Sequence, residues 1–171
     1  MLKRILISLL ISLTIVSASF GASMSDYLEN KVADYIFRGQ AYTAPTVLCV
    51  ALATAAPTDA TTGATLAEAA YTGYARAALN PSVSNWKGTG LEVTGVSAGT
   101  SGTVKNNAII TLGTAATTGP TTVTHFAVLD SCTIGAGNVL FWQALTTSKT
   151  INNGDPAPSF AVDALTVQID N

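Results

Sequence analysis

The chain has 171 residues, of which 48% are hydrophobic and only 11% are charged, and its formal net charge is −2 at pH 7. Soluble domains usually carry about a quarter charged residues, so Thr, Ser, Ala, Gly and Asn must cover much of this surface. The sequence has no cluster of Lys and Arg, which argues against nucleic-acid binding through phosphate neutralisation. The length favours one domain. The composition favours strands and loops, and a surface covered by copies of the chain or by partners.

The N-terminus predicts a hydrophobic leader over residues 1–23. Two positive residues precede an uncharged apolar run, and small residues follow it. This order is typical of a secretory signal peptide, with cleavage after Ala18 or Ala22, and the run is short for a spanning helix. Three interpretations stay open: a cleaved signal peptide, a retained helix that contacts a membrane through residues 5–20 or packs in an assembly, and a chain that starts at Met24.

A helix is predicted directly after the leader, over residues 26–38. Ser25 is a favourable N-cap, acidic residues occupy the first turn, and Gly39 suits the position just past the end. Four apolar residues fall at helical spacing and form one stripe: Leu28, Val32, Tyr35 and Ile36. The stripe packs either on the domain's own sheet or on a neighbouring subunit.

The remainder of the chain predicts strands separated by turn residues. The segments are 46–53, 74–79, 91–96, 103–112, 123–130, 137–145 and 160–169, with one helical turn at 66–70. Asn106 and Asn107 form a polar centre in the fourth segment, and the last segment changes phase, which suggests a bulge. We expect a mainly β fold, an antiparallel β-sandwich (jelly-roll or immunoglobulin-like) of about 7–8 strands with one N-terminal α-helix. Residues 24–171 are expected to form this single domain.

Segments 123–130 and 137–145 are the most strand-like pair and read as antiparallel neighbours. Strict alternation along the first segment puts four side chains on one face: Val123, His125, Ala127 and Leu129. Phe126 and Val128 then lie on the opposite face. Since neither face is polar, we expect central strands that are covered on both sides.

Residues that carry chemistry are sparse. His125 is the only histidine, and no Gly-x-Ser-x-Gly motif accompanies it, so we expect it to be a packing residue. Asp130 and Asp155 are expected to hold turns. Trp86 and Trp142 suit core packing better than a sugar platform. Without metal-ligand spacing or a nucleotide motif, the prediction is a protein that is not an enzyme, with no catalytic, cofactor-binding or metal-binding residues.

Two cysteines, Cys49 and Cys132, lie at or beside predicted strands. They are either two small buried side chains or a disulfide, and export from the cytoplasm would favour the disulfide. The spacing alone does not decide between these alternatives.

Several short motifs occur in a characteristic order. They are Phe37-Arg38-Gly39, residues 42–52, Ala56-Pro57-Thr58-Asp59, Gly73-Tyr74-Ala75-Arg76, Trp86, and residues 107–112, 123–130, 138–145 and 148–155. In this order, over about residues 25–170, the chain resembles the small tailed-phage virion proteins described as tail-fibre, capsid-fibre or decoration proteins.

This resemblance implies a non-enzymatic virion structural protein, a capsid decoration, fibre or tail-associated module that acts by self-assembly and docking. Its partners would be copies of itself and other virion proteins, with no nucleic acid and no small-molecule substrate. The leader departs from this pattern, because it is not expected on a phage protein assembled in the cytoplasm. The alternative hypothesis is an exported bacterial β-sandwich, secreted or at the cell surface, that binds glycans or protein partners.

Overall fold

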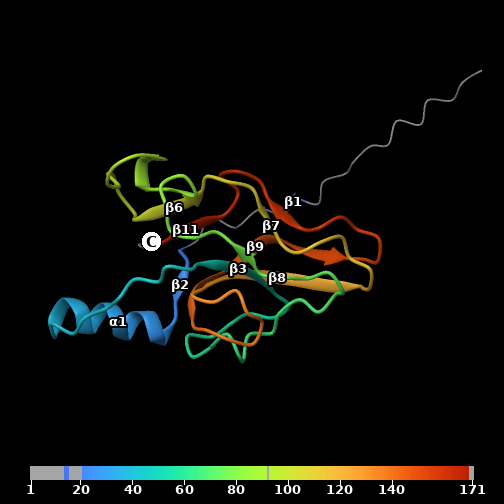
Figure 1. Ribbon diagram of the computed structural model, residues 1–171, viewed down its shortest axis with the longest axis horizontal. Helices are drawn as coiled ribbons and strands as arrows, with labels where there is room; N and C mark the ends of the chain where they lie inside the picture. Colours follow the sequence, from blue (N-terminus) through green and yellow to red (C-terminus); the bar gives the residue numbers. More distant parts are fainter. Residues whose placement is uncertain (1–13, 16–20, 92, 170–171) are drawn as a thin grey trace, which may run out of the picture.

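The computed structural model describes residues 14–15, 21–91 and 93–169. Most of the regular secondary structure in the described residues is β-strand, and one α-helix lies near the N-terminus (Figure 1). In chain order the elements are β1 (Thr14–Ile15), β2 (Ser23–Met24), α1 (Asp26–Phe37), β3 (Cys49–Ala53), β4 (Ala77–Ala78), β5 (Trp86–Lys87), a 3₁₀ turn at Thr89–Leu91, β6 (Thr103–Asn106), β7 (Ile110–Thr111), β8 (Thr121–Leu129), β9 (Val139–Ile151), β10 (Ser159–Phe160) and β11 (Thr166–Gln168).

The strands form a five-stranded sheet and two three-stranded sheets. The large sheet has the order β2-β9-β8-β3-β4, and the smaller sheets have the orders β1-β10-β7 and β11-β6-β5. All pairs are antiparallel except β1 with β10. The predicted mainly β, antiparallel fold with an N-terminal helix is therefore confirmed, as is the pairing of the two most strand-like segments, β8 and β9.

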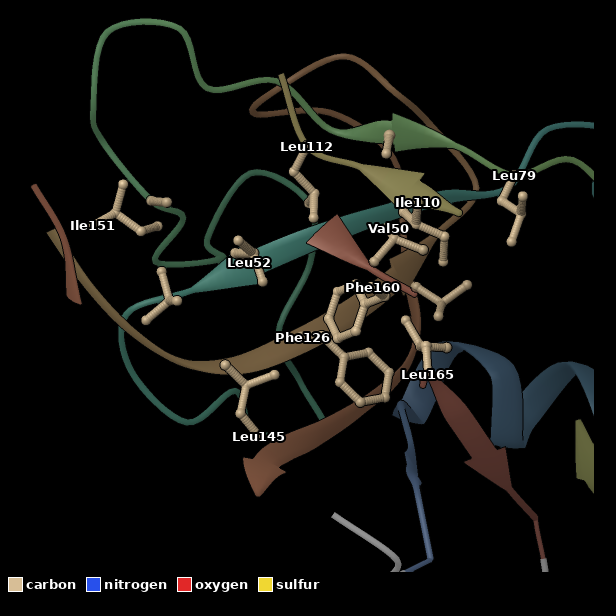
Figure 2. Close-up of a cluster of buried hydrophobic side chains, with 14 of the residues drawn as sticks. Val50, Leu52, Leu79, Ile110, Leu112, Phe126, Leu145, Ile151, Phe160 and Leu165 are labelled. Carbon is tan, nitrogen blue, oxygen red and sulfur yellow. The ribbon is translucent and has the colours of Figure 1, made fainter. Parts of the chain in front are cut away.

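The main hydrophobic core lies between the large sheet and the two small sheets. It combines Phe126 of β8 and Val50 of β3 with Ile110 of β7, Phe160 of β10 and Val167 of β11. The rings of Phe126 and Phe160 meet edge to face, with centroids 6.0 Å apart, and Figure 2 shows them at the centre of the cluster. Two layers closed over one core make a β-sandwich.

A second, smaller core covers the opposite face of the large sheet. Ala127 and Leu129 of β8 pack there with Val139 of β9 and with Leu66 from the loop after β3. In Figure 1 this loop, in teal, and the β8–β9 connector, in orange, lie together beneath the large sheet. The prediction that β8 is covered on both faces is thus confirmed.

The predicted faces of β8 are wrong at one residue. Val123 packs in the main core with Phe126 and Val128, rather than on the side of Ala127 and Leu129. The β8–β9 register shifts between Val123 and His125. A bulge reverses the alternation of side chains at that point, so strict period-two counting placed Val123 on the wrong face.

The segment 103–112 does not form one strand, because Asn106 ends β6. Its Nδ2 donates to the carbonyls of Ala108 (2.8 Å) and Ala161 (2.7 Å), and its Oδ1 accepts from Leu165 N (2.8 Å). The Asn106 side chain forms the hydrogen bonds that a neighbouring strand would otherwise form with the backbone. The chain then passes from the sheet of β6 to the sheet of β7. The polar centre noted in the sequence marks this crossing.

Four other predicted segments also differ in the structure. Segment 160–169 is divided into β10 and β11 by a turn at Asp163, whose φ is +65°, so its change of phase is a turn rather than a bulge. Residues 93–96 form no strand, and segment 74–79 contributes only β4. The predicted helical turn at 66–70 is instead extended chain, with a bridge between Ala53 and Glu68.

Helix α1 begins and ends as predicted, to within one residue. Ser25 Oγ accepts from Leu28 N (3.3 Å) and also donates to the carbonyl of Val139, while Ser25 N donates to Leu140 O (3.1 Å). One residue therefore caps the helix and anchors it to β9.

The leader lies outside the described residues except for 14–15 and 21–23. Within the described part of the chain, no helix has the length and apolarity needed to cross a membrane.

Candidate interaction surface

An open apolar groove of about 610 Å³ lies beside the first half of α1. Its walls come from α1, from the segment between α1 and β3, and from strands of two sheets. The main apolar side chains are Leu28, Val32, Leu48, Trp86, Phe141 and Val167. The Trp86 indole donates to the carbonyl of Leu79 (2.8 Å) and packs on the main core, which holds this wall in place.

The groove presents no unpaired charge. Among its lining residues only Lys87 is charged, and its Nζ lies 2.8 Å and 2.7 Å from the two carboxylate oxygens of Asp163. Tyr42 also lines the groove, and burial raises its pKa, with smaller contributions from Tyr27 and Asp130. Such a surface is suited to apolar side chains rather than to ionic ligands.

The second half of α1 leaves the body of the domain, as Figure 1 shows. Leu28 is the only buried residue of the helix. The side chains at its end are largely exposed, with 61% for Tyr35, 62% for Ile36 and 83% for Phe37. The predicted apolar stripe is therefore buried only at Leu28, and its far end is largely exposed among the residues that the structure describes.

A buried polar network lies on the other side of the large sheet, around Arg76. The guanidinium, in a residue only 6% exposed, donates to both carboxylate oxygens of Glu68 at 2.5–3.1 Å. It also donates to the carbonyls of Ser131 and Ala136 (both 2.8 Å) and of Gly63 (3.1 Å). Tyr74 adds a hydroxyl donor to Glu68 (2.8 Å), and burial raises its pKa.

This network ties the long loop after β3 to the β8–β9 connector. Every nitrogen of the guanidinium is engaged, so the arrangement is structural rather than reactive. Sequence reasoning missed it because a single Arg and a single Glu, eight residues apart, have no periodic signal. The only indication was the motif that contains Gly73 and Arg76.

The residues singled out for chemistry lie apart. His125 is half-buried, forms a hydrogen bond with the Thr124 hydroxyl (2.8 Å) and has its pKa lowered by burial. Asp130 accepts from Asn138 N (2.6 Å) and Asp155 from Asn152 N (2.7 Å), so both acids hold turns. Among the described residues, no three His, Cys, Asp or Glu side chains gather as metal ligands would.

Cys49 and Cys132 form a disulfide, with their Cα atoms 5.3 Å apart. This resolves the two alternatives left open by the sequence. Cys49 is fully buried in β3 and Cys132 is exposed in the β8–β9 connector. The bond therefore fastens the same connector that the Arg76 network holds.

A β-sandwich with an apolar groove and an exposed apolar helix end presents the kind of surface that marks contacts with other proteins. Comparison with protein families assigns the chain to the phage virion fibre proteins. The matching model is that of Podophage GP4 fiber I protein gp80, and because it covers residues 23–168, the chain belongs to this family. The resemblance seen in the sequence and the virion location are confirmed. No curated protein matches the chain significantly.

Proposed function

We propose that this virion structural protein is a fibre or decoration module that acts by self-assembly and by docking on other virion proteins. The observation that carries the proposal is the match to a fibre-protein family over residues 23–168. The low charge of the chain, the apolar groove and the exposed helix end support a role that depends on protein contacts. A structural family is also consistent with a chain that is not an enzyme.

We further propose that residues 24–171 act as one domain. The main core joins side chains from β3 through β11, and the family model spans nearly the same range. The leader over residues 1–23 and its membrane contact through residues 5–20 stay predictions. The mass of the chain recovered from particles tests them, because a signal peptide would be missing and a retained leader would be present.

The function is tested on purified phage particles. Quantitative mass spectrometry is expected to find the chain in every particle, at a fixed ratio to the major capsid protein, with many copies for a decoration and fewer for a tail fibre. An antibody against the domain is expected to label intact particles at one class of position. Absence of the chain from particles that have full infectivity would refute the proposal.

A further inference from the structure

We propose that the helix tip, defined as residues 35–37, seats in the apolar groove of a neighbouring copy of this chain. The inference rests on the proposed self-assembly and specifies the surfaces that carry it. Both surfaces belong to the same polypeptide: the groove beside the first half of α1, and the tip that leaves the domain at the end of the same helix.

The geometry of α1 requires the contact to be intermolecular. Leu28 and Val32 line the groove, and the stripe continues from them to Ile36. At 1.5 Å per residue, Ile36 lies roughly 12 Å further along the helix axis than Leu28. A helix that forms one wall of the groove cannot bend its own end into that groove. The tip can therefore enter only the groove of another copy.

The exposed area is adequate for such a contact. A whole aromatic side chain presents roughly 200 Å², and Tyr35 and Phe37 are 61% and 83% exposed. These two side chains thus offer roughly 290 Å², before Ile36 and the groove residues are added. A stable interface buries about 800 Å² on each partner, so a tip seated in a groove supplies the apolar centre of an interface of ordinary size.

The cation beside the tip and the cation that lines the groove are each paired with a carboxylate. Arg38 Nη1 lies 3.1 Å from the Asp34 carboxylate beside the tip, and Lys87 is paired with Asp163 at the groove. Seating the tip therefore buries neither of these two cations without its partner. An anionic lipid surface or an acidic peptide would find no free cation among the groove residues, which favours a second copy.

A contact between a tip and a groove joins two different surfaces of the chain. Such contacts can close either as a reciprocal pair, in which two copies exchange tips, or as a ring. A closed arrangement uses every tip and every groove, whereas contacts whose rotation does not close continue as an open filament. The proposal thus predicts that this chain associates with itself in solution.

The first test compares the oligomeric state of the purified full-length chain with that of matched variants by analytical ultracentrifugation. Phe37→Asp changes the tip, and Val83→Asp changes the groove, where Val83 is 52% exposed. The control is Ile109→Asp, since Ile109 is 66% exposed and lies outside the groove. Each of the first two is expected to weaken association about 30-fold or more. The control is expected to associate like the wild type, and circular dichroism verifies that all four chains fold.

The second test is a disulfide trap. The described part of the chain has no free cysteine, so an engineered pair reports the contact. Mixing Phe37→Cys with Val83→Cys under mild oxidation is expected to give a cross-linked heterodimer. Mixing Phe37→Cys with Ile109→Cys is expected to give none.

A wild-type chain that is monomeric, or tip and groove variants that associate normally, would overturn the interface. Occupation of the groove by the chain's own N-terminal residues would also overturn the interface. This failure is separable from that of the proposed function: a monomeric chain found in particles retains the virion role without this interface. An oligomeric chain absent from particles has the interface and lacks the role.

Discussion

Replacing Arg76 by alanine is expected to destabilise the domain far more than any exposed charge does. The change removes every guanidinium donor to the Glu68 carboxylate, leaving it only the Tyr74 hydroxyl, and the donors to three backbone carbonyls. Because Glu68 and the guanidinium are almost fully buried, water does not readily replace these donors. The long loop after β3 and the β8–β9 connector also lose the contact that joins them.

The expected cost follows from this burial. Removing one partner of a buried ion pair costs about 3–5 kcal/mol, since the other charge is left without compensation. For a domain of this length, about 2–4 °C of melting temperature is lost per kcal/mol. The melting temperature of Arg76→Ala is therefore expected to fall by roughly 6–20 °C. The double variant Arg76→Met with Glu68→Leu is expected to recover part of the loss, because no buried charge remains.

The assay is urea denaturation followed by circular dichroism, together with a thermal melt, at one protein concentration throughout. The matched control is Arg38→Ala, which makes the same truncation in an ion pair with Asp34 at the surface. Exposed pairs contribute about 0–1 kcal/mol, so the control is expected to stay close to the wild type.

A cost for Arg76→Ala no larger than that of Arg38→Ala would refute this reasoning. It would mean that solvent enters the network readily and that the loop and connector are held by other contacts. If the double variant Arg76→Met with Glu68→Leu were as unstable as Arg76→Ala, the unsatisfied carbonyls, rather than the Glu68 charge, would account for the lost stability.

Three further outcomes are expected. Phe160→Ala empties the centre of the main core and is expected to cost about 3–5 kcal/mol by urea denaturation, with Phe160→Leu intermediate. Reducing the bond between Cys49 and Cys132, which are 83 residues apart, is expected to cost about 2–4 kcal/mol, measured as the shift in stability on adding reductant. Burial lowers the pKa of His125 below 6.5, so the unfolded chain takes up the proton first and stability is lost as pH falls through about 6.5. His125→Gln is expected to flatten the stability profile as pH falls below about 6.5.

Each outcome has a result that would contradict it. Equal stability of Phe160→Ala and Phe160→Leu would mean that the core collapses without leaving a cavity. A Cys49→Ser and Cys132→Ser double variant that still responds to reductant would show that the effect does not come from this bond. A profile for His125→Gln as steep as that of the wild type would assign the pH dependence to other groups.

The sequence predicted those elements whose signals are local. The boundaries of α1 followed from Ser25 and Gly39, because capping chemistry is written in a few adjacent residues. The β8–β9 pair followed from two runs of apolar and β-branched residues. In both cases the segment's own residues specify the structure, and the tertiary contacts agree with them.

The prediction failed where a single residue interrupts a strand or shifts its register. Asn106 and the turn at Asp163 each end a strand inside an apolar segment, and one bulge moved Val123 to the other core. None of these events has a periodic signature. The Arg76 network and the groove are assembled from residues far apart in the sequence, so only the folded arrangement reveals them.

The anchoring of α1 has a mechanical consequence. Ser25 donates hydrogen bonds to the carbonyls of Val139 and Leu140, and β2 pairs with β9 just before the helix. A pull on the helix tip is therefore transmitted through Ser25 into β9, the longest strand of the large sheet. β9 distributes that load along the whole ladder it shares with β8. In an assembly connected by its helix tips, tension would pass from copy to copy through the hydrogen bonds of the large sheet, because the chain after the tip also enters that sheet, at β3.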